Sequence, residues 1–502
     1  MKSNQLKSGV LLSYVSTALN MLIQIIYTPV MINLLGQSEY GLYSLVASVV
    51  SYLSLLSFGM TSSYLRFYSR YKVTNDHKGE ASLNGMFLVV FICMSLIAIV
   101  VGFVLSLFPV QIFGNKLTAE ELEKSQILMR ILVVNIALTF PSSIFDSIVS
   151  AHEQFVFQKL LKIATVVFNP FICLPLLMMG YDSVAIVIVT TFLTIIHLCV
   201  NVWFCIKKLN TKFMLRNFNF GLLREIAIFS SFIFINILVN QINWSVDKLI
   251  LGRTLGTNEV AVYGVSADIN SLFISLSSTI SAVFAPRINK ISAENNFDKN
   301  EKYTTLFIRV GRIQYLLLML VASGFVIFGK YFITKIYLSD TYEMSYYAAM
   351  LLILPAMIPS IQNLGIEIQR AENKHKFRSI AYLIMAILNI IISIPMAMRY
   401  GCVGTSAGTA ISIILANGIL MNIYYYKTMK INIVLFWKNI LKLSKGMIIP
   451  ILCGVFIMNR IVIDSTIDFC IWVVIYTAVY IVSQYLFGMN EDEKSFICKI
   501  KR

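Results

Sequence analysis

Apolar runs of about twenty residues recur along the whole chain, and this recurrence limits what the chain can fold into. A helix needs about 20 apolar residues to cross a hydrocarbon core about 30 Å thick. Of the 502 residues, 58% are hydrophobic and 13% are charged, whereas a soluble globular protein carries about 25% charged residues. The sequence therefore predicts an all-α integral membrane protein.

We predict about fourteen transmembrane helices. Their approximate spans are 9–33, 41–64, 85–108, 127–149, 159–180, 183–206, 225–246, 260–284, 309–329, 346–366, 378–398, 402–425, 446–463 and 467–487. The first run is too long for a signal peptide and should stay as a helix. Most lysines and arginines follow the even-numbered spans, so the positive-inside rule predicts that both termini are cytoplasmic.

The same charge distribution excludes several function classes. The net charge of +16 arises from short loops between apolar spans, and no basic run is interleaved with aromatic residues, so we expect no nucleic-acid partner. The eight cysteines show no CxxC spacing, which gives no reason to expect disulfides or a metal site. No nucleotide-binding loop, GxSxG or HExxH motif is present. We therefore predict neither an enzyme nor a cofactor.

The segment from Lys430 to Lys445 is too short and too charged to span a membrane. Apolar residues such as Phe436 and Ile440 alternate there with lysines such as Lys438. This pattern is typical of a helix that lies flat on the cytoplasmic face, where lysines meet anionic headgroups. A plain connecting loop explains the segment nearly as well.

The second half of the chain repeats the first at an offset of 220 residues. The matches are Leu35, Gly36, Glu39 and Tyr43 with Leu255, Gly256, Glu259 and Tyr263, Asn20 with Asn240, and Ala151, Asn169 and Pro175 with Ala371, Asn389 and Pro395. Six helices per repeat place both repeats in the same orientation across the membrane. We predict two parallel six-helix bundles, 1–218 and 219–428, around a central cavity, followed by a C-terminal part, 429–502, that holds the last helix pair.

Polar residues recur at helical spacing within corresponding spans of the two repeats. Because hydrocarbon leaves polar groups unsatisfied, such stripes should face a cavity or another helix. The candidate cavity-lining residues are Asn20, Gln24, Ser48, Asn236, Asn240, Asn243 and Ser271. For the serines alone, hydrogen bonding between helices is the better explanation.

Three carboxylates within or beside the spans are candidates for ion coupling: Asp247, Asp268 and Asp146. A carboxylate at mid-membrane costs about 2.5–3.5 kcal/mol on insertion scales unless it is paired or protonated. We expect Asp268 to bind a coupling H⁺ or Na⁺ or to pair with a cation, and Asp146 to be similar but shallower. His197 stands alone on an apolar run and is better explained as a packed histidine.

Five cations are candidates for binding an anionic substrate: Arg66, Arg70, Lys248, Arg287 and Arg370. Arg66 and Arg287 end corresponding helices and are expected at the cytoplasmic mouth of the cavity. Guanidinium groups match phosphate oxygens in geometry. For each residue singly, ordinary positive-inside flanking is at least as good an explanation.

Two stretches carry a resemblance to a known family. The first runs through Pro29, Leu35-Gly36 and Glu39-Tyr40-Gly41-Leu42-Tyr43 to Arg66 and Arg70. The second holds Asn243, Asp247-Lys248, Leu251-Gly252, Leu255-Gly256, Glu259 and Val262-Tyr263-Gly264. Over its full length the chain resembles the polysaccharide (O-antigen or Wzx-type) flippases of the multidrug/oligosaccharidyl-lipid/polysaccharide exporter superfamily, which implies a MATE-like fold.

The resemblance implies a multi-pass protein of the bacterial inner membrane that moves undecaprenyl-diphosphate-linked oligosaccharide to the outer leaflet. It also implies alternating access powered by an ion gradient, contact with membrane lipids, and a polysaccharide polymerase and export proteins as partners. Lipid II flippases typically place an arginine in helix 1, whereas this chain has no charge between Lys7 and Glu39. A cation-coupled drug or small-molecule antiporter is the alternative, and a membrane glycan polymerase, ligase or acyltransferase ranks last.

Overall fold

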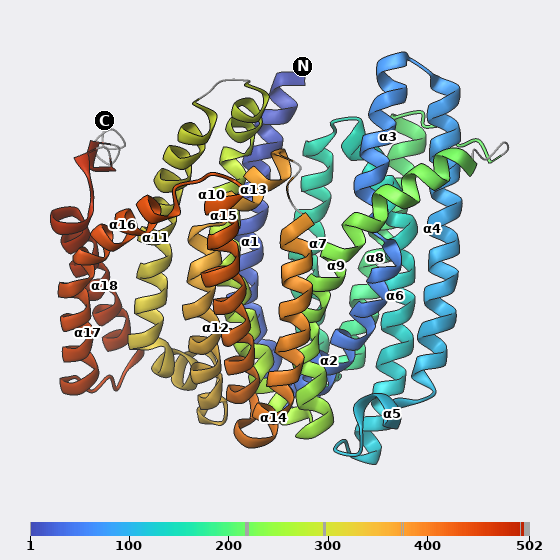
Figure 1. Ribbon diagram of the computed structural model, residues 1–502. Helices are drawn as coiled ribbons and strands as arrows, with labels where there is room; N and C mark the ends of the chain where they lie inside the picture. Colours follow the sequence, from blue (N-terminus) through green and yellow to red (C-terminus); the bar gives the residue numbers. More distant parts are fainter. Residues whose placement is uncertain are drawn as a thin grey trace. The chain divides into compact units, whose positions relative to one another are not determined.

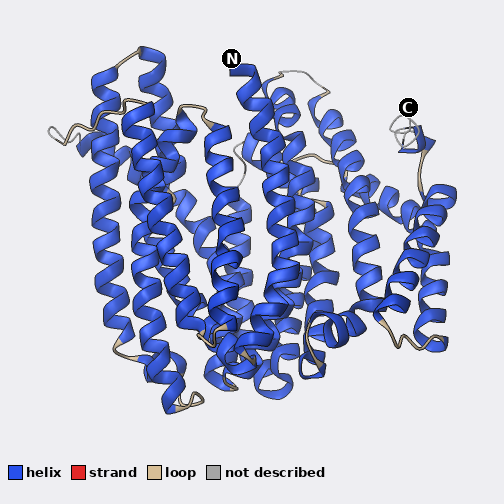
Figure 2. Ribbon diagram, turned by 180° about the vertical axis from the view of Figure 1, so that it is seen from behind, coloured by secondary structure: helices blue, strands red, loops and turns tan. Residues whose placement is uncertain are grey.

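The computed structural model describes residues 2–215, 220–294, 298–372, 374, 376–491 and 493–495. These residues form helices and connecting loops, with no strand among them (Figure 2). They divide into two compact units, Met1–Gly264 and Val265–Arg502. The predicted domain boundaries at 218 and 428 remain predictions.

Among its described residues, the first unit contains nine α-helices and the beginning of a tenth. They are α1 (Lys2–Leu35), α2 (Gln37–Ser51), α3 (Met60–Thr74), α4 (His77–Ser106), α5 (Pro109–Phe113), α6 (Ala119–Ala151), α7 (Phe155–Met178), α8 (Ser183–Trp203), α9 (Phe220–Thr254) and the first residues of α10 (Thr257–Ala293). Figure 1 shows α5 at one end of this unit and the turn between α3 and α4 at the other.

In the part of the second unit that the structure describes, the rest of α10 is followed by eight further α-helices. They are α11 (Lys299–Tyr331), α12 (Glu343–Ile361), α13 (Leu364–Ala371), α14 (Lys376–Ile413), α15 (Asn422–Lys427), α16 (Ile433–Ser444), α17 (Ile448–Arg460) and α18 (Thr466–Ser483). Both units have aromatic-rich cores, built around residues such as Tyr64 and Phe91 in the first and Phe307 and Phe436 in the second.

Side-chain caps fix where several helices begin. Thr118 and Glu121 form a capping box at the start of α6, and the carboxylates of Asp76 and Asp182 accept backbone N–H groups at the starts of α4 and α8. Such caps satisfy N–H groups that have no partner within the helix. The boundaries therefore follow from polar residues just before apolar runs.

Among the described residues, twelve helices are long and apolar enough to cross a membrane. One of them, Lys376–Lys427, reverses at Gly401, where φ is 60° and ψ is −140°. Beyond this turn Gly404 and Gly408 contact Met396 and Ser393, so the two arms run antiparallel. The 35-residue helix α9 also has spanning length, and the structure is thus compatible with the fourteen predicted spans.

The second predicted span is broken in the middle. A 3-10 segment, Tyr52–Ser57, separates α2 from α3, and Phe58 and Gly59 have φ values of 47° and 69°. A Cβ atom at Gly59 would collide with Ile233 of α9. Glycine is therefore required there both for its backbone conformation and for the close approach of α9. The same helix continues to Thr74, beyond the predicted end at 64.

The predicted interfacial segment is a helix rather than a loop. In α16 the side chains of Ile433, Phe436, Ile440 and Leu443 are buried, and Phe436 packs on Phe307 of α11 with ring centroids 4.9 Å apart. Arg312 of α11 donates to the carbonyl of Asn439 and forms a bidentate pair with Glu493 at 2.6 and 2.7 Å. These contacts hold the C-terminal part against α11 within the second unit.

Gly41 allows α2 to touch the start of α10, since its missing Cβ would overlap the carbonyl of Thr257. We expect Gly41→Ala to destabilise the protein by about 1–3 kcal/mol, because a backbone carbonyl cannot move aside as a side chain can. Gly324→Ala in α11 is the control, as no atom lies within 4 Å of its Cβ position. The thermal unfolding midpoint in detergent should fall only for the first variant; equal midpoints would contradict the close contact.

Candidate functional site

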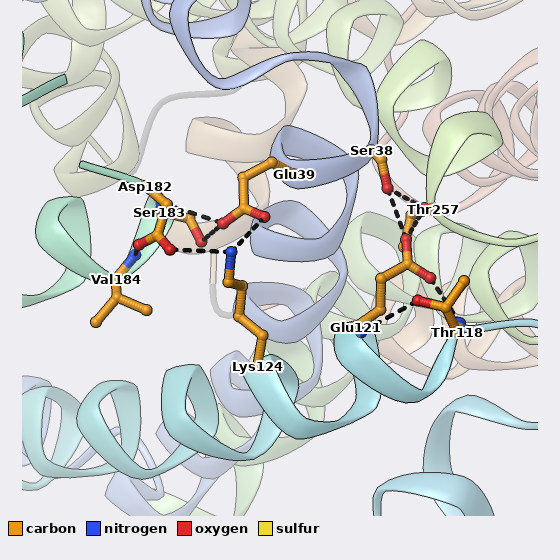
Figure 3. A network of polar contacts seen from close by, with 9 residues as sticks. All are labelled: Ser38, Glu39, Thr118, Glu121, Lys124, Asp182, Ser183, Val184 and Thr257. Carbon is orange, nitrogen blue, oxygen red and sulfur yellow. Dashed lines mark hydrogen bonds and ion pairs between the residues drawn. The ribbon is translucent and has the colours of Figure 1, made fainter. Parts of the chain in front are cut away.

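A lysine lies between two carboxylates at the ends of three helices in the first unit. Lys124 of α6 contacts Glu39 of α2 at 3.1 Å and Asp182, the cap of α8, at 2.9 Å (Figure 3). The backbone N–H of Ser183 donates to Glu39 at 3.2 Å, and the hydroxyl of Ser183 donates to the same oxygen. These residues tie the starts of α2 and α8 and the first turn of α6 together.

A second carboxylate joins two turns that correspond in the sequence repeat. Glu121 accepts hydrogen bonds from Ser38, after the α1–α2 turn, at 2.6 Å, and from Thr257, after the α9–α10 turn, at 2.7 Å (Figure 3). In both turns the matching glycine, Gly36 or Gly256, has a positive φ, 82° and 99°. Glu121 also accepts the N–H of Thr118 at 2.8 Å, which fixes the carboxylate from its own helix.

The neighbours of Asp182 in this network change the pKa of its carboxyl group. Partial burial by itself raises the pKa of this carboxyl, but the hydrogen bond and charge of Lys124 and the N–H of Val184 outweigh burial and hold the pKa below its ordinary value of 3.8. The carboxylate is therefore stabilised in its ionised form. We call this set of residues the turn network: Ser38, Glu39, Thr118, Glu121, Lys124, Asp182, Ser183 and Thr257.

Polar side chains also join α9 to α2 and α3 along their length. Lys248 donates to Ser44 at 2.8 Å, Ser245 lies 3.3 Å from Ser51, and Ser63 and Ser230 are 2.7 Å apart. The second and seventh predicted spans thus meet through polar side chains of α2, α3 and α9. For these serines, the interhelical hydrogen bonds fit the simpler explanation given above.

The predicted cavity-lining residues have varied surroundings. Ser48 is buried and bonds to the carbonyl of Leu45 at 2.7 Å. Asn20 is half-buried, whereas Gln24 and Ser271 are exposed. The side chains of Asn236, Asn240 and Asn243 lie outside the described residues. That these seven residues line a cavity remains a prediction.

Among the predicted substrate-binding cations, Arg70 and Arg370 each pair with a carboxylate. Arg70 pairs with Glu225 of α9 at 3.0 and 3.4 Å and lies over the ring of Phe67. Arg370 pairs with Glu367 one turn away in α13 at 2.9 Å.

The other three cations differ in exposure. Arg66 and Arg287 are exposed and lie within α3 and α10, not at the helix ends as predicted, because both helices continue further. Lys248 is half-buried beside Ser44. Their role in substrate binding stays a prediction.

The three predicted ion-coupling carboxylates lie in different places. Asp247 of α9 is fully buried and accepts the hydroxyl of Tyr263 at 2.7 Å. Asp268 of α10 is half-buried and belongs to the second unit. Asp146 of α6 contacts His197 and Asn201 of α8, so His197 has a carboxylate partner that its apolar neighbours in the sequence gave no reason to expect.

Sequence reasoning missed Glu39, Glu121, Lys124 and Asp182 as parts of one cluster. Each stands beside a predicted turn, and Asp182 directly before Ser183 is typical of a helix cap, but the four come from segments far apart in the chain. Within the described ranges, no group of three His, Cys, Asp or Glu residues is placed to hold a metal ion.

Comparisons with known proteins extend these observations. The family described as "Polysaccharide biosynthesis protein" matches residues 6–292. A putative O-antigen transporter from Shigella flexneri is 20% identical over 406 residues, covering 78% of this chain and 90% of the relative.

Solved structures of similar fold include a lipid II flippase, MurJ, in an inward closed conformation. It has a TM-score of 0.71 and 18% identity, covering 95% of this chain and 98% of that one. A multidrug resistance MATE family transporter of the MOP superfamily in an inward-facing conformation has a TM-score of 0.66 and 15% identity, covering 85% and 99%. The predicted MATE-like fold is confirmed.

Replacing Lys124 with Met removes the ammonium group between Glu39 and Asp182. We expect a loss of about 1–3 kcal/mol of folding stability at pH 7, between the values for exposed and buried pairs. Because the pKa of Asp182 is lowered, its contribution is present above its ordinary pKa and is lost as the pH falls through the lowered value. The difference in thermal unfolding midpoint should therefore shrink below about pH 4.

Lys335→Met is the matched control, since Lys335 forms an exposed pair with Asp340 at 2.8 Å. Its loss should stay below about 1 kcal/mol at any pH. Equal losses in the two variants would show that the turn network adds no more than a surface ion pair.

Proposed function

The chain belongs to the polysaccharide biosynthesis protein family, and from this membership we propose that it is a flippase for lipid-linked oligosaccharides. It moves undecaprenyl-diphosphate-linked repeat units from the cytoplasmic to the outer leaflet by alternating access. The family match over residues 6–292 carries this proposal. The similarity to a putative O-antigen transporter over most of both chains supports it.

The proposed cellular setting follows from the same membership. The protein lies in the cytoplasmic membrane of a bacterium with both termini in the cytoplasm, as its basic loops predict. It works beside the polymerase and export proteins that use the flipped repeat unit. No covalent chemistry is required of the chain itself, because the lipid-linked substrate leaves as it entered.

Alternating access requires one hydrogen bond of the turn network to break. In the predicted topology the α1–α2 and α9–α10 turns lie at the outer face, where Glu121 bonds to both. Opening toward the outside requires Thr257 to leave Glu121, while Lys124, Glu39 and Asp182 stay together within their own bundle. Hydrogen bonds to a charged group contribute about 1.5–3 kcal/mol, an amount that an ion gradient can offset.

The proposed substrate carries a diphosphate, and the exposed arginines provide the matching charge. Arg66 and Arg287 lie toward the predicted cytoplasmic ends of corresponding helices and are exposed. Arg70 pairs with Glu225, so its guanidinium group can bind phosphate only after it leaves that carboxylate. Guanidinium groups bind phosphate oxygens through paired N–H donors.

A cation-coupled small-molecule antiporter is the second candidate, because the MATE multidrug transporter shares the fold with a TM-score of 0.66. The two candidate functions differ in the transported substrate, a lipid-linked oligosaccharide or a small molecule. The full chain reconstituted in proteoliposomes should expose a labelled undecaprenyl-diphosphate oligosaccharide on the opposite leaflet faster than empty vesicles do. Transport of a fluorescent aromatic cation without lipid flipping would replace the flippase proposal with the antiporter.

Neutralising Arg66 and Arg287 together tests the anionic binding role. The variant Arg66→Gln with Arg287→Gln should bind undecaprenyl diphosphate at least about tenfold more weakly, since each lost charge-assisted hydrogen bond costs about 1.5–3 kcal/mol. Native mass spectrometry measures the bound fraction. The paired control is Arg253→Gln with Arg399→Gln, which removes the same charge from exposed arginines near the predicted outer face. Equal binding by both variants would leave Arg66 and Arg287 as topology anchors.

A further inference from the structure

Three levels of polar contact lie along the interface between α6 and α8. Lys124 contacts Asp182 and Glu39 at one end. Asn135 donates to Thr191 and Thr194 at 3.3 and 3.1 Å. Asp146 contacts His197 and Asn201 at the third level.

The spacing of these levels places them on one stripe of α6. Lys124, Asn135 and Asp146 are separated by eleven residues each, and eleven residues make about three turns of helix. At 1.5 Å per residue the stripe is about 33 Å long, similar to a hydrocarbon core of about 30 Å. Hydrogen-bonding groups are thus buried at several depths within a single bundle.

The third level is the part of this stripe that can exchange a proton. Nε2 of His197 lies 3.3 and 3.4 Å from the two carboxylate oxygens of Asp146. Asn201, one turn further along α8 and 1% exposed, donates to Oδ1 at 2.8 Å. Imidazole is the side chain that ordinarily changes its charge between pH 5 and 8. With one shared proton the pair is neutral, and without it the carboxylate is held by Asn201.

The donors around Asp146 favour a proton over Na⁺ as the bound ion. Hard cations take several oxygen ligands, whereas the described contacts to this carboxylate come from nitrogen atoms of His197 and Asn201. The side chains of Asp146 and His197 are 31% and 22% exposed, so protein atoms do not enclose the pair completely.

Other titratable groups nearby have their own contacts. Cys205, in the segment that follows α8, bonds to the carbonyl of Phe145 and interacts electrostatically with Asp146. On α4, Glu80 lies 3.9 Å from His152 at the end of α6 and 3.8 Å from His77. On α3, Tyr68 lies 3.2 Å from His152.

We propose that Asp146 and His197 form the proton-binding site through which a proton gradient drives transport, a role that rests on the proposed flippase function. The proton arrives from water, adds to the pair, and returns to water on the other side of the membrane when the bundle changes its access. Only an O–H or N–H bond forms and breaks, and no oxidant or co-reactant is needed.

The transport test uses proteoliposomes of the full chain in sodium-free buffer, with and without an imposed pH gradient. For the wild type the gradient should accelerate flipping of labelled undecaprenyl-diphosphate oligosaccharide. For Asp146→Asn and His197→Gln the ratio of the two rates should fall to unity, while folded protein is recovered in equal amounts by size exclusion. His77→Gln is the control, because the side chain of His77 is 88% exposed.

Asp268→Asn is the competing variant in the same assay. Loss of acceleration in Asp268→Asn, with acceleration kept in Asp146→Asn and His197→Gln, would overturn the proposal and move coupling to the second unit. Failure of the wild type to flip the lipid under any gradient would instead overturn the proposed function.

A spectroscopic test examines the proton-binding site separately from the flippase function, because it needs no substrate. In ¹⁵N-histidine-labelled protein in detergent, the resonance lost in His197→Gln belongs to His197. Recorded between pH 5 and 8, the position of this resonance should depend on pH, and Asp146→Asn should change that dependence. A His197 signal that stays unchanged across this range would overturn the proposal, and a purely packing role predicts that result.

Discussion

Inside a bilayer every peptide group must find its hydrogen-bond partner within the protein, and this requirement governs the whole chain. It explains why the described residues form helices without a strand. It also explains where the backbone departs from the helix. The 3-10 segment between α2 and α3 lies against α9 through Gly59, and the reversal at Gly401 is followed by glycines packed on the preceding arm. In both places a glycine lets a neighbouring helical segment pack against the irregular backbone.

The same requirement makes polar side chains meet at helix interfaces. Lys248 meets Ser44 where α9 lies along α2, and Asp247 meets Tyr263 at the start of α10. Away from water, such pairs between neighbouring helices satisfy polar side chains that hydrocarbon would leave without a partner. The charged contacts concentrate at helix ends, where Lys124 and Glu121 each join segments that are remote in the sequence. The first unit therefore combines long apolar contacts with a few directional ones.

The sequence was informative about features that depend on local pattern. Neighbouring residues alone indicate the apolar runs, the helix caps and the glycine at each repeat-related turn. The family was also recognised from short local motifs. The partners of Glu39 and His197 could not be predicted, because Ser183 is 144 residues from Glu39 and Asp146 is 51 residues from His197. The apolar run around His197 predicts a membrane span but gives no information on which helix packs beside it. The break near Gly59 was missed for the same reason, since its cause is the approach of α9.

The repeat suggests two equal bundles, but the polar stripe of α6 exists in the first repeat alone. At the offset of 220, Lys124, Asp146 and His197 correspond to Met344, Ile366 and Asn417. The backbone of a duplicated helix pair is preserved by apolar packing, which tolerates such changes as long as volume and pattern are kept. Charges inside a membrane are costly to keep without a partner, so a repeat that loses one member of a pair is expected to lose the others. The carboxylate of Asp146 and the imidazole of His197 are both missing at the matching positions, Ile366 and Asn417, as this cost predicts for a site needed only once.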